Sequence, residues 1–234
     1  MRVKNSQLRI PHSALDKRLI IFTRYPEPGK TKTRLIPALG PEGAADLHRQ
    51  MVDSTLTWAR QLKNNSAMSL EVRCEGGDEY KIRQWLGPDI PYCPQGDGDL
   101  GARMAQAFHE AFSAGMARVI IVGTDVPGLT GDLVQTACEA LMDNDAVLGP
   151  AKDGGYYLIG LRKPIPHLFG SIPWGTGEVL PKTLGFAAEL NLRVLLLEPL
   201  DDVDRPGDLA IWEQKKCLKC LECAKVPKVK KNEK

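Results

Sequence analysis

The sequence predicts one α/β domain with a mostly parallel central sheet. Short, apolar and β-branched runs at residues 19–22 and 119–122 are typical of strands that are buried on both faces of such a sheet. Runs of this kind alternate along the chain with segments of helical spacing, which is the pattern of successive βαβ units. The 234 residues suffice for one sizeable domain of this class and leave little for a second.

The other elements are expected from the same signals. Further strands are predicted at residues 70–74, 92–93, 146–148 and 194–197. Asp153-Gly154-Gly155 favours a tight turn that leads into one more strand at Tyr156. Helices are predicted at residues 41–63, 80–86, 130–141 and 178–190, and a last one opens at Pro206. Pro41 suits an early helical position, and Thr130 suits an N-cap.

One further helix is expected directly after the glycine-containing stretch at residues 95–101. Leu100, Met104, Phe108 and Phe112 recur at every fourth position, so we expect them to form its buried stripe. Arg103 lies outside that stripe, near the start of the helix. A ligand phosphate, Asp99 and solvent are all open to it as partners.

Composition and charge narrow the class of protein. We expect a loose leader at residues 1–17, a folded domain at 18–215 and a Cys/Lys-rich tail at 216–234. Residues 1–224 hold 26 basic and 28 acidic side chains, a net charge of −2 that lacks the electrostatic footprint of a nucleic-acid-binding protein. No run approaches the ~20 apolar residues of a membrane span, and the start lacks an apolar signal segment. We therefore expect a cytoplasmic protein with no nucleic-acid or membrane partner.

The loop after the first strand concentrates positive charge. Lys30, Lys32 and Arg34 lie within five residues, next to Gly29. A polyphosphate requires such a loop, because backbone donors can approach it closely and cationic side chains add to them. The stretch is not a P-loop, since the first glycine of that motif would fall at Arg24. A solvated basic loop is the alternative.

Asp125 follows the apolar run at 119–122 and precedes Pro127-Gly128. Ligands of open α/β sheets bind beyond the carboxyl ends of the strands, so an acid at this place suits a divalent cation that carries a phosphate. A loop aspartate that initiates a turn is the alternative. Asp153 offers a second carboxylate, beside two bare backbones that suit a sugar or another polar acceptor.

Six motifs occur in a fixed order: F-x-R-x-P-x-P-G-x-x-K-T-R-L, G-D-L-G-x-R-M, G-T-D-x-P-x-L, G-P-x-x-D-G-G-Y, W-x-T and D-D-V-D-x-P-x-D-L. Together they resemble the glycosyltransferase-like proteins of the nucleotide-diphospho-sugar transferase superfamily, relatives of phospholactate and molybdenum-cofactor guanylyltransferases. The resemblance spans residues 19–212. It implies a three-layer α/β/α, GT-A-like Rossmannoid fold that binds an NTP or NDP-sugar with Mg²⁺ or Mn²⁺.

The resemblance also assigns roles to individual residues. It implies metal ligation by Asp125 and Asp202, with Asp204 as the close alternative to the latter, and catalytic roles for Lys30, Arg34 and Asp153. Contacts with nucleotide or substrate are assigned to Gly29, Lys32, Gly98, Gly101, Arg103, Gly123, Thr124, Gly154, Gly155, Trp174 and Thr176. The first loop lacks the G-x-x-x-R-x-G-x-x-K pattern of the guanylyltransferases, and the central motif has one aspartate where many glycosyltransferases have Asp-x-Asp.

The reaction that this implies is transfer from an activated nucleotide to a small-molecule acceptor. Glycosyl transfer from an NDP-sugar is the preferred interpretation, with Asp153 as the candidate general base. The alternative for Asp153 is that it is only the first residue of a tight turn. Nucleotidyl transfer from an NTP to a phosphorylated acceptor is the alternative. A nucleotide-binding module without catalysis is the third, and the presence of both Asp125 and Asp202 argues against it. The acceptor, the base, the sugar and the oligomeric state, a homodimer included, are left open.

Neither the histidines nor the last three cysteines indicate a definite site. His12, His48, His109 and His167 show no metal-binding spacing, so we expect each to be a surface or helix residue. Cys217, Cys220 and Cys223 form C-x-x-C-x-x-C, but Pro227 stands where a cluster motif would need its fourth cysteine. A zinc site with an outside ligand, a link between two chains and a reduced tail remain open.

Overall fold

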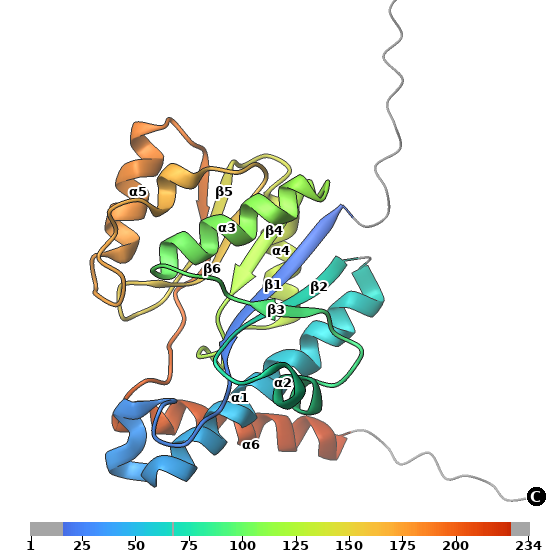
Figure 1. Cartoon of the computed structure of the whole chain (residues 1–234), viewed down its shortest axis with the longest axis vertical. Coiled ribbons are helices and arrows are strands. Elements are labelled where there is room, and N and C mark those ends of the chain that lie inside the picture. The colour runs from blue at the N-terminus through green and yellow to red at the C-terminus, as the bar shows by residue number, and fades with distance from the viewer. Residues whose placement is uncertain (1–15, 67, 226–234) are drawn as a thin grey trace, which may run out of the picture.

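A seven-stranded sheet forms the centre of the molecule in the computed structural model, which describes residues 16–66 and 68–225, with side chains described up to residue 217. The strand order is β3-β2-β1-β4-β6-β5-β7, and only β6 runs antiparallel to its neighbours (Figure 1). The strands are β1 (Lys17–Arg24), β2 (Met68–Glu75), β3 (Tyr92–Pro94), β4 (Arg118–Val122), β5 (Ala146–Pro150), β6 (Tyr156–Leu161) and β7 (Val194–Leu196). The predicted, mostly parallel sheet is confirmed.

The helices fall close to their predicted positions. They are α1 (Ile36–Ser66), α2 (Glu79–Leu86), α3 (Leu100–Ser113), α4 (Gly131–Ala140), α5 (Val179–Glu189) and α6 (Leu209–Lys225), with short 3₁₀ turns at Thr33–Leu35, Pro166–Phe169 and Pro206–Asp208. Gly40, with φ 71° and ψ 169°, interrupts α1. Regular helix therefore restarts at Pro41, where a proline is tolerated because the first N–H groups of a helix have no partner.

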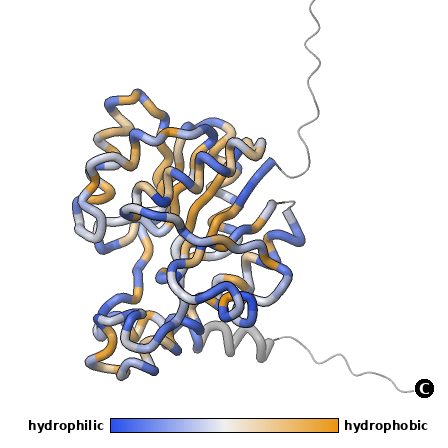
Figure 2. Tube along the Cα trace, viewed as in Figure 1, coloured by the Kyte–Doolittle hydropathy of each residue, from blue (hydrophilic) through white to orange (hydrophobic). Residues whose placement is uncertain are grey.

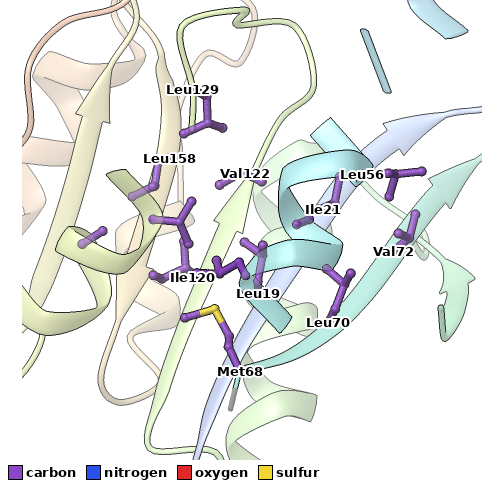
Figure 3. Packing of buried hydrophobic residues seen from close by; sticks show 14 of the residues in the cluster. Leu19, Ile21, Leu56, Met68, Leu70, Val72, Ile120, Val122, Leu129 and Leu158 are labelled. Carbon is purple, nitrogen blue, oxygen red and sulfur yellow. The ribbon is translucent and has the colours of Figure 1, made fainter. Parts of the chain in front are cut away.

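The sheet is covered on both faces, which gives the expected three layers. Alternate residues of β1 show this: Leu19 and Ile21 pack with α1, α2 and α4, whereas Ile20 and Phe22 pack with α3 and α5. Figure 3 shows Leu19 and Ile21 beside Leu56 of α1. Apolar residues concentrate along the strands and polar ones on the outer turns (Figure 2).

The buried stripe of α3 differs from the prediction. Met104 and Phe108 are buried as expected, but Leu100 is 42% exposed and Phe112 is only partly buried. A step of four residues rotates by 400°, so a strict four-residue repeat drifts by 40° at each step around a helix of 3.6 residues per turn. The two outer members of the repeat therefore lie at the edges of the buried face, and small residues complete its centre: Gly101, Ala107 and Ala111.

A third, smaller cluster lies beyond the carboxyl end of β1, where α6 packs along the start of α1 (Figure 1). Leu35, Val203 and Trp212 are its buried members from the first loop, from the segment after β7 and from α6. This cluster joins two loops that the sequence places far apart. The predicted domain end at residue 215 falls inside α6, and Cys220 and Cys223 have side chains outside the described part of the chain.

Among the helices that the structure describes, none combines the length and apolar character needed to cross a bilayer.

The N-cap of α4 offers a test of the fold. The Thr130 side chain accepts a hydrogen bond from the Leu133 N–H at 3.3 Å, as expected. Thr130→Ala should lower the free energy of unfolding by about 1 kcal/mol, because one N–H group loses its acceptor. Thr130→Ser should retain most of that stability, since its hydroxyl can cap the helix in the same way. Urea unfolding of the three proteins checks this, and equal losses for both variants would contradict it.

Candidate functional site

Two cavities adjoin each other beyond the carboxyl ends of the strands. The first has a volume of about 340 Å³; it is called the basic cavity here and is lined by Arg24, Lys30, Thr31, Lys32, Thr33, Arg34, His48, Asp125 and Asp204. The second, of about 390 Å³, is called the acidic cavity and is lined by Arg34, Lys152, Asp153, Gly175, Thr176, Gly177, Asp201, Asp202, Asp204, Arg205, Asp208 and Ile211. Arg34 and Asp204 belong to both, and their side chains form an ion pair of 2.5 Å between the two cavities.

Lys32 holds the first loop in place. Its side chain is only 4% exposed, and Nζ contacts Asp125 Oδ2 at 3.0 Å and donates to the Val203 carbonyl at 2.6 Å. Its backbone is left-handed, with φ 51°, a conformation that is unfavourable for a residue with a side chain. Lys32 was predicted to contact nucleotide; in the structure it is a buried clamp that joins the first loop, the loop after β4 and the segment after β7.

Lys30 and Arg34 are the exposed cations of the same loop. Lys30 is 71% exposed and pairs with Glu27 at 2.9 Å, and Arg34 is 61% exposed and pairs with Asp204. Gly29 has φ 79°, so the loop turns where a side chain would be strained. Exposed pairs of this kind contribute little to stability, so both cations can exchange their partners for a phosphate at small cost.

The two predicted metal ligands lie in neighbouring cavities. Asp125 lines the basic cavity and Asp202 the acidic one, and the Val203 N–H donates to the Asp125 carbonyl at 2.9 Å, which holds the two loops together. Asp125 Oδ1 is buried and has no hydrogen-bond partner among the described residues. Within that part of the chain, no group of three or more His, Cys, Asp or Glu side chains is arranged to hold a metal ion.

The acidic cavity brings Asp153 and Asp202 together. Burial raises the pKa of Asp202 above its ordinary value, and the charge of Asp153 adds to that rise. Asp153 Oδ1 accepts from the Gly155 N–H at 2.9 Å, so this residue does form the turn that was its alternative. Gly154 has φ 91°, and a Cβ there would lie 2.5 Å from Gly177. This close approach joins the turn to the loop before α5.

Arg103 and Gly98 lie outside both cavities. Arg103 pairs with Glu75 at 3.3 Å and donates to the Gly98 carbonyl at 3.0 Å, rather than to Asp99. Asp99 instead caps α3 and accepts from the Ala102 N–H at 2.8 Å. Because a cap needs an acceptor and the helix start has free N–H groups, the aspartate is better used there than as a partner for arginine.

The other residues predicted to bind nucleotide or substrate make contacts within the protein, and their binding roles stay predictions. A Cβ on Gly101 would lie 2.6 Å from the Trp174 ring, so this glycine lets the indole pack closely on α3. The Thr176 hydroxyl donates to the Pro173 carbonyl at 2.8 Å, at the rim of the acidic cavity. The Gly123 N–H donates to the Tyr157 carbonyl at 3.2 Å, and Thr124 is buried.

Sequence reasoning did not select His48 for the site. It lies on α1, as a helix residue was expected to, but it is buried and lines the basic cavity. Its Nε2 is 2.9 Å from the Arg24 carbonyl, and its Nδ1 is 3.9 Å from Asp125 Oδ1. Burial lowers the pKa of His48, although the charge of Asp125 opposes that effect. The one sequence signal for a role in the site was that this histidine falls on the buried face of α1. A histidine that only makes hydrogen bonds in the core falls on such a face as well.

Comparison with known proteins identifies the family. Residues 57–176 match a family model described as "Uncharacterized protein conserved in bacteria (DUF2064)". The chain belongs to this family. The DUF2064 chain is also 29% identical over 185 residues to a phosphoenolpyruvate guanylyltransferase from Chloroflexus aurantiacus, a match that covers 74% of this chain and 85% of that protein.

Solved structures agree with the family assignment. A protein from Desulfovibrio desulfuricans G20, provisionally named a nucleotide-diphospho-sugar transferase, is 39% identical, with a TM-score of 0.77 over 82% of this chain and 83% of that one. A nucleotidyl transferase from Methanothermobacter, 15% identical, has a TM-score of 0.58 over 86% of this chain and 99% of that one, which shows the shared fold. The expected superfamily and its GT-A-like fold are thus confirmed.

The clamp can be tested with two lysines of one loop. Lys32→Met should lower the free energy of unfolding by about 1–3 kcal/mol, because it leaves the Val203 carbonyl and Asp125 without their cation. Lys30→Met should change it by less than about 0.5 kcal/mol, since that lysine is exposed. Urea unfolding of both variants measures the difference. Similar losses for the two would show that the buried contact of Lys32 is not a clamp.

The raised pKa of Asp202 predicts a pH-dependent gain in stability on its removal. A carboxyl whose pKa is higher in the folded than in the unfolded state destabilises the fold once the pH exceeds both values. In EDTA at pH 7, Asp202→Asn should therefore unfold at a higher urea concentration than wild type. The advantage should fade as the pH falls through the raised pKa and should vanish below 3.8, the ordinary value, because the wild-type carboxyl is then protonated in both states. Equal midpoints at pH 7 would contradict a raised pKa of Asp202 in the folded protein.

Proposed function

We propose that this chain is a metal-dependent transferase that uses an activated nucleotide, and that it transfers a glycosyl group from a nucleotide-diphospho-sugar. The observation that carries the proposal is the pair of adjoining cavities, one basic and one acidic, that meet at the Arg34–Asp204 ion pair. A nucleotide-diphospho-sugar also has two chemically different parts. Its diphosphate is anionic and suits the basic cavity, and its sugar is a neutral polyol that suits the acidic one.

The basic cavity suits the diphosphate. Arg24, Lys30 and Arg34 line it, and each is paired with an acid at the surface: Glu75, Glu27 and Asp204. Phosphate oxygens form stronger, charge-assisted hydrogen bonds with arginine, often two at a time. Lys30 and Arg34 would add donors to the leaving diphosphate, a role whose removal costs roughly 10²–10³ in rate in comparable sites.

The carboxylates fit a divalent cation such as Mg²⁺ or Mn²⁺. The buried Asp125 Oδ1 has no partner in the described structure, and Asp202 lies among other acids that repel its charge. Mg²⁺ is usually held by one or two carboxylates together with substrate phosphates and water, so these two donors suffice. When bound, the cation would offset the charge that develops on the leaving diphosphate.

The acidic cavity suits hydroxyl groups. Asp153, Asp201 and Asp202 line it, and carboxylates accept hydrogen bonds from a sugar or a polyol acceptor. In the proposed reaction the acceptor oxygen bonds to the anomeric carbon, the bond from that carbon to the diphosphate breaks, and the acceptor proton passes to Asp153. Five aspartates and three cations line this cavity, so an anionic acceptor would meet a net negative charge, which favours glycosyl transfer.

The second candidate is nucleotidyl transfer, which the similarity to a phosphoenolpyruvate guanylyltransferase favours. In that reaction an acceptor phosphate would attack the α-phosphorus of an NTP and pyrophosphate would leave, with no base required. A binding module without catalysis is less consistent with two acids held at the cavities. A cytoplasmic location and a homodimer stay predictions.

A ligand panel tests the proposal. In thermal unfolding with Mn²⁺, an NDP-sugar at 100 times its Kd should stabilise wild type by ~2.7 kcal/mol, or roughly 5–10 °C. Asp125→Ala should lose the metal-dependent part of the shift, and Asp143→Ala, at an exposed position after α4, should keep it.

Product analysis decides between the reactions. Release of NDP from an NDP-sugar supports glycosyl transfer, whereas release of pyrophosphate from GTP with phosphoenolpyruvate supports the alternative. If neither product forms and no nucleotide shifts the melting temperature, the proposed function is wrong.

A further inference from the structure

Two buried polar atoms face each other in the basic cavity without satisfying each other. His48 Nδ1 and Asp125 Oδ1 are 3.9 Å apart, too far for a hydrogen bond. Neither atom has any other partner among the residues that the structure describes. The His48 side chain is only 6% exposed. Since buried polar atoms are nearly always paired, this gap calls for an explanation.

The contact of the other ring nitrogen shows which nitrogen of His48 carries the proton. Nε2 is 2.9 Å from the Arg24 carbonyl, and a carbonyl can only accept, so Nε2 carries the proton. In the neutral ring Nδ1 then presents a lone pair. Asp125 Oδ1 presents one as well, so two acceptors point into the same small space.

The surroundings of the two acceptors resemble the outer shell of a metal site. A metal-bound histidine usually donates its other N–H to a carbonyl or carboxylate, and His48 donates Nε2–H to Arg24. A metal-bound carboxylate is usually hydrogen-bonded through its second oxygen, and Asp125 Oδ2 is 3.0 Å from Lys32 Nζ. The contacts with Arg24 and Lys32 thus orient both groups through their other polar atoms. His48 Nδ1 and Asp125 Oδ1 remain available to bind a ligand between them.

We propose that His48 Nδ1 and Asp125 Oδ1 together ligate the divalent cation of the basic cavity. This rests on the proposed function, in which the cation serves a nucleotide. Mg²⁺ is bound through oxygen, whereas first-row transition-metal ions also accept an imidazole nitrogen, so the site should prefer Mn²⁺ to Mg²⁺. Arg24, Lys30 and Arg34 line the same cavity, so the cation should bind weakly until a diphosphate has neutralised them.

Pulsed electron paramagnetic resonance of bound Mn²⁺ tests the ligand directly. The probes are Mn²⁺ alone and Mn²⁺ with ADP, CDP, GDP or UDP, whichever stabilises the protein. A nitrogen that ligates Mn²⁺ modulates the electron spin echo, and ¹⁵N-labelled histidine should change that modulation in wild type. His48→Gln should abolish it, whereas His109→Gln, at an exposed position of α3, should leave it intact.

Affinity gives a second readout. His48→Gln should weaken nucleotide-dependent Mn²⁺ binding by about 10–100-fold and Mg²⁺ binding by less, which reduces the preference for Mn²⁺. Its amide can still reach the Arg24 carbonyl, so the helix is little disturbed. Should the variant fail to fold, the labelled wild-type protein still shows whether a histidine ligates Mn²⁺, and His48 is the described histidine that lines the basic cavity.

The outcomes separate this proposal from the function. If Mn²⁺ and a nucleotide bind but no histidine nitrogen couples to the metal, the ligand assignment is wrong and the proposed function stands; a water that bridges the two acceptors then explains the gap. If no nucleotide binds with Mn²⁺, the proposed function and the ligand assignment are both wrong.

Discussion

The buried ammonium group of Lys32 is the interaction on which the site depends. It is held by the Asp125 carboxylate and the Val203 carbonyl, which belong to two loops distant from its own. Removing a charged group from water is costly unless acceptors replace the water, and here two acceptors do so. The left-handed backbone of Lys32 adds a cost of order 1 kcal/mol, which the clamp must also offset.

The clamp acts together with the small apolar cluster beneath it. Val203 is fully buried against Leu35 and Trp212, and its backbone bonds to both Lys32 and Asp125. One residue therefore joins the hydrophobic support to the polar site. Since α6 supplies Trp212 to this cluster and its Ile211 lines the acidic cavity, the last helix supports the site.

Local patterns in the sequence were enough to predict most of the fold. The run at residues 119–122 predicted a buried strand, which the structure has as β4, and the acid that follows it lies at the edge of the sheet where ligand binding was expected. Local patterns could not predict which side chains, far apart in the sequence, would form contacts in the fold. The Lys32 ammonium finds Val203, 171 residues later, and Arg103 finds Glu75 rather than the nearer Asp99. The position of His48 beside Asp125 was missed as well, because it depends on how α1 packs against the loop after β4.

The division between the cavities constrains the kind of donor that fits them. Arg34 and Asp204 neutralise each other at the boundary, and Asp204 is kept in place because its N–H donates to Asp208 Oδ2 at 3.1 Å. A phosphate that takes Arg34 would leave the Asp204 carboxylate facing the acidic cavity. In the proposed donor complex the cavity would then be more negative, which favours a cation or a neutral group rich in hydroxyls as its next occupant. A phosphorylated acceptor would have to draw a cation of this cavity such as Lys152 away from its partner Asp201, and a sugar would not.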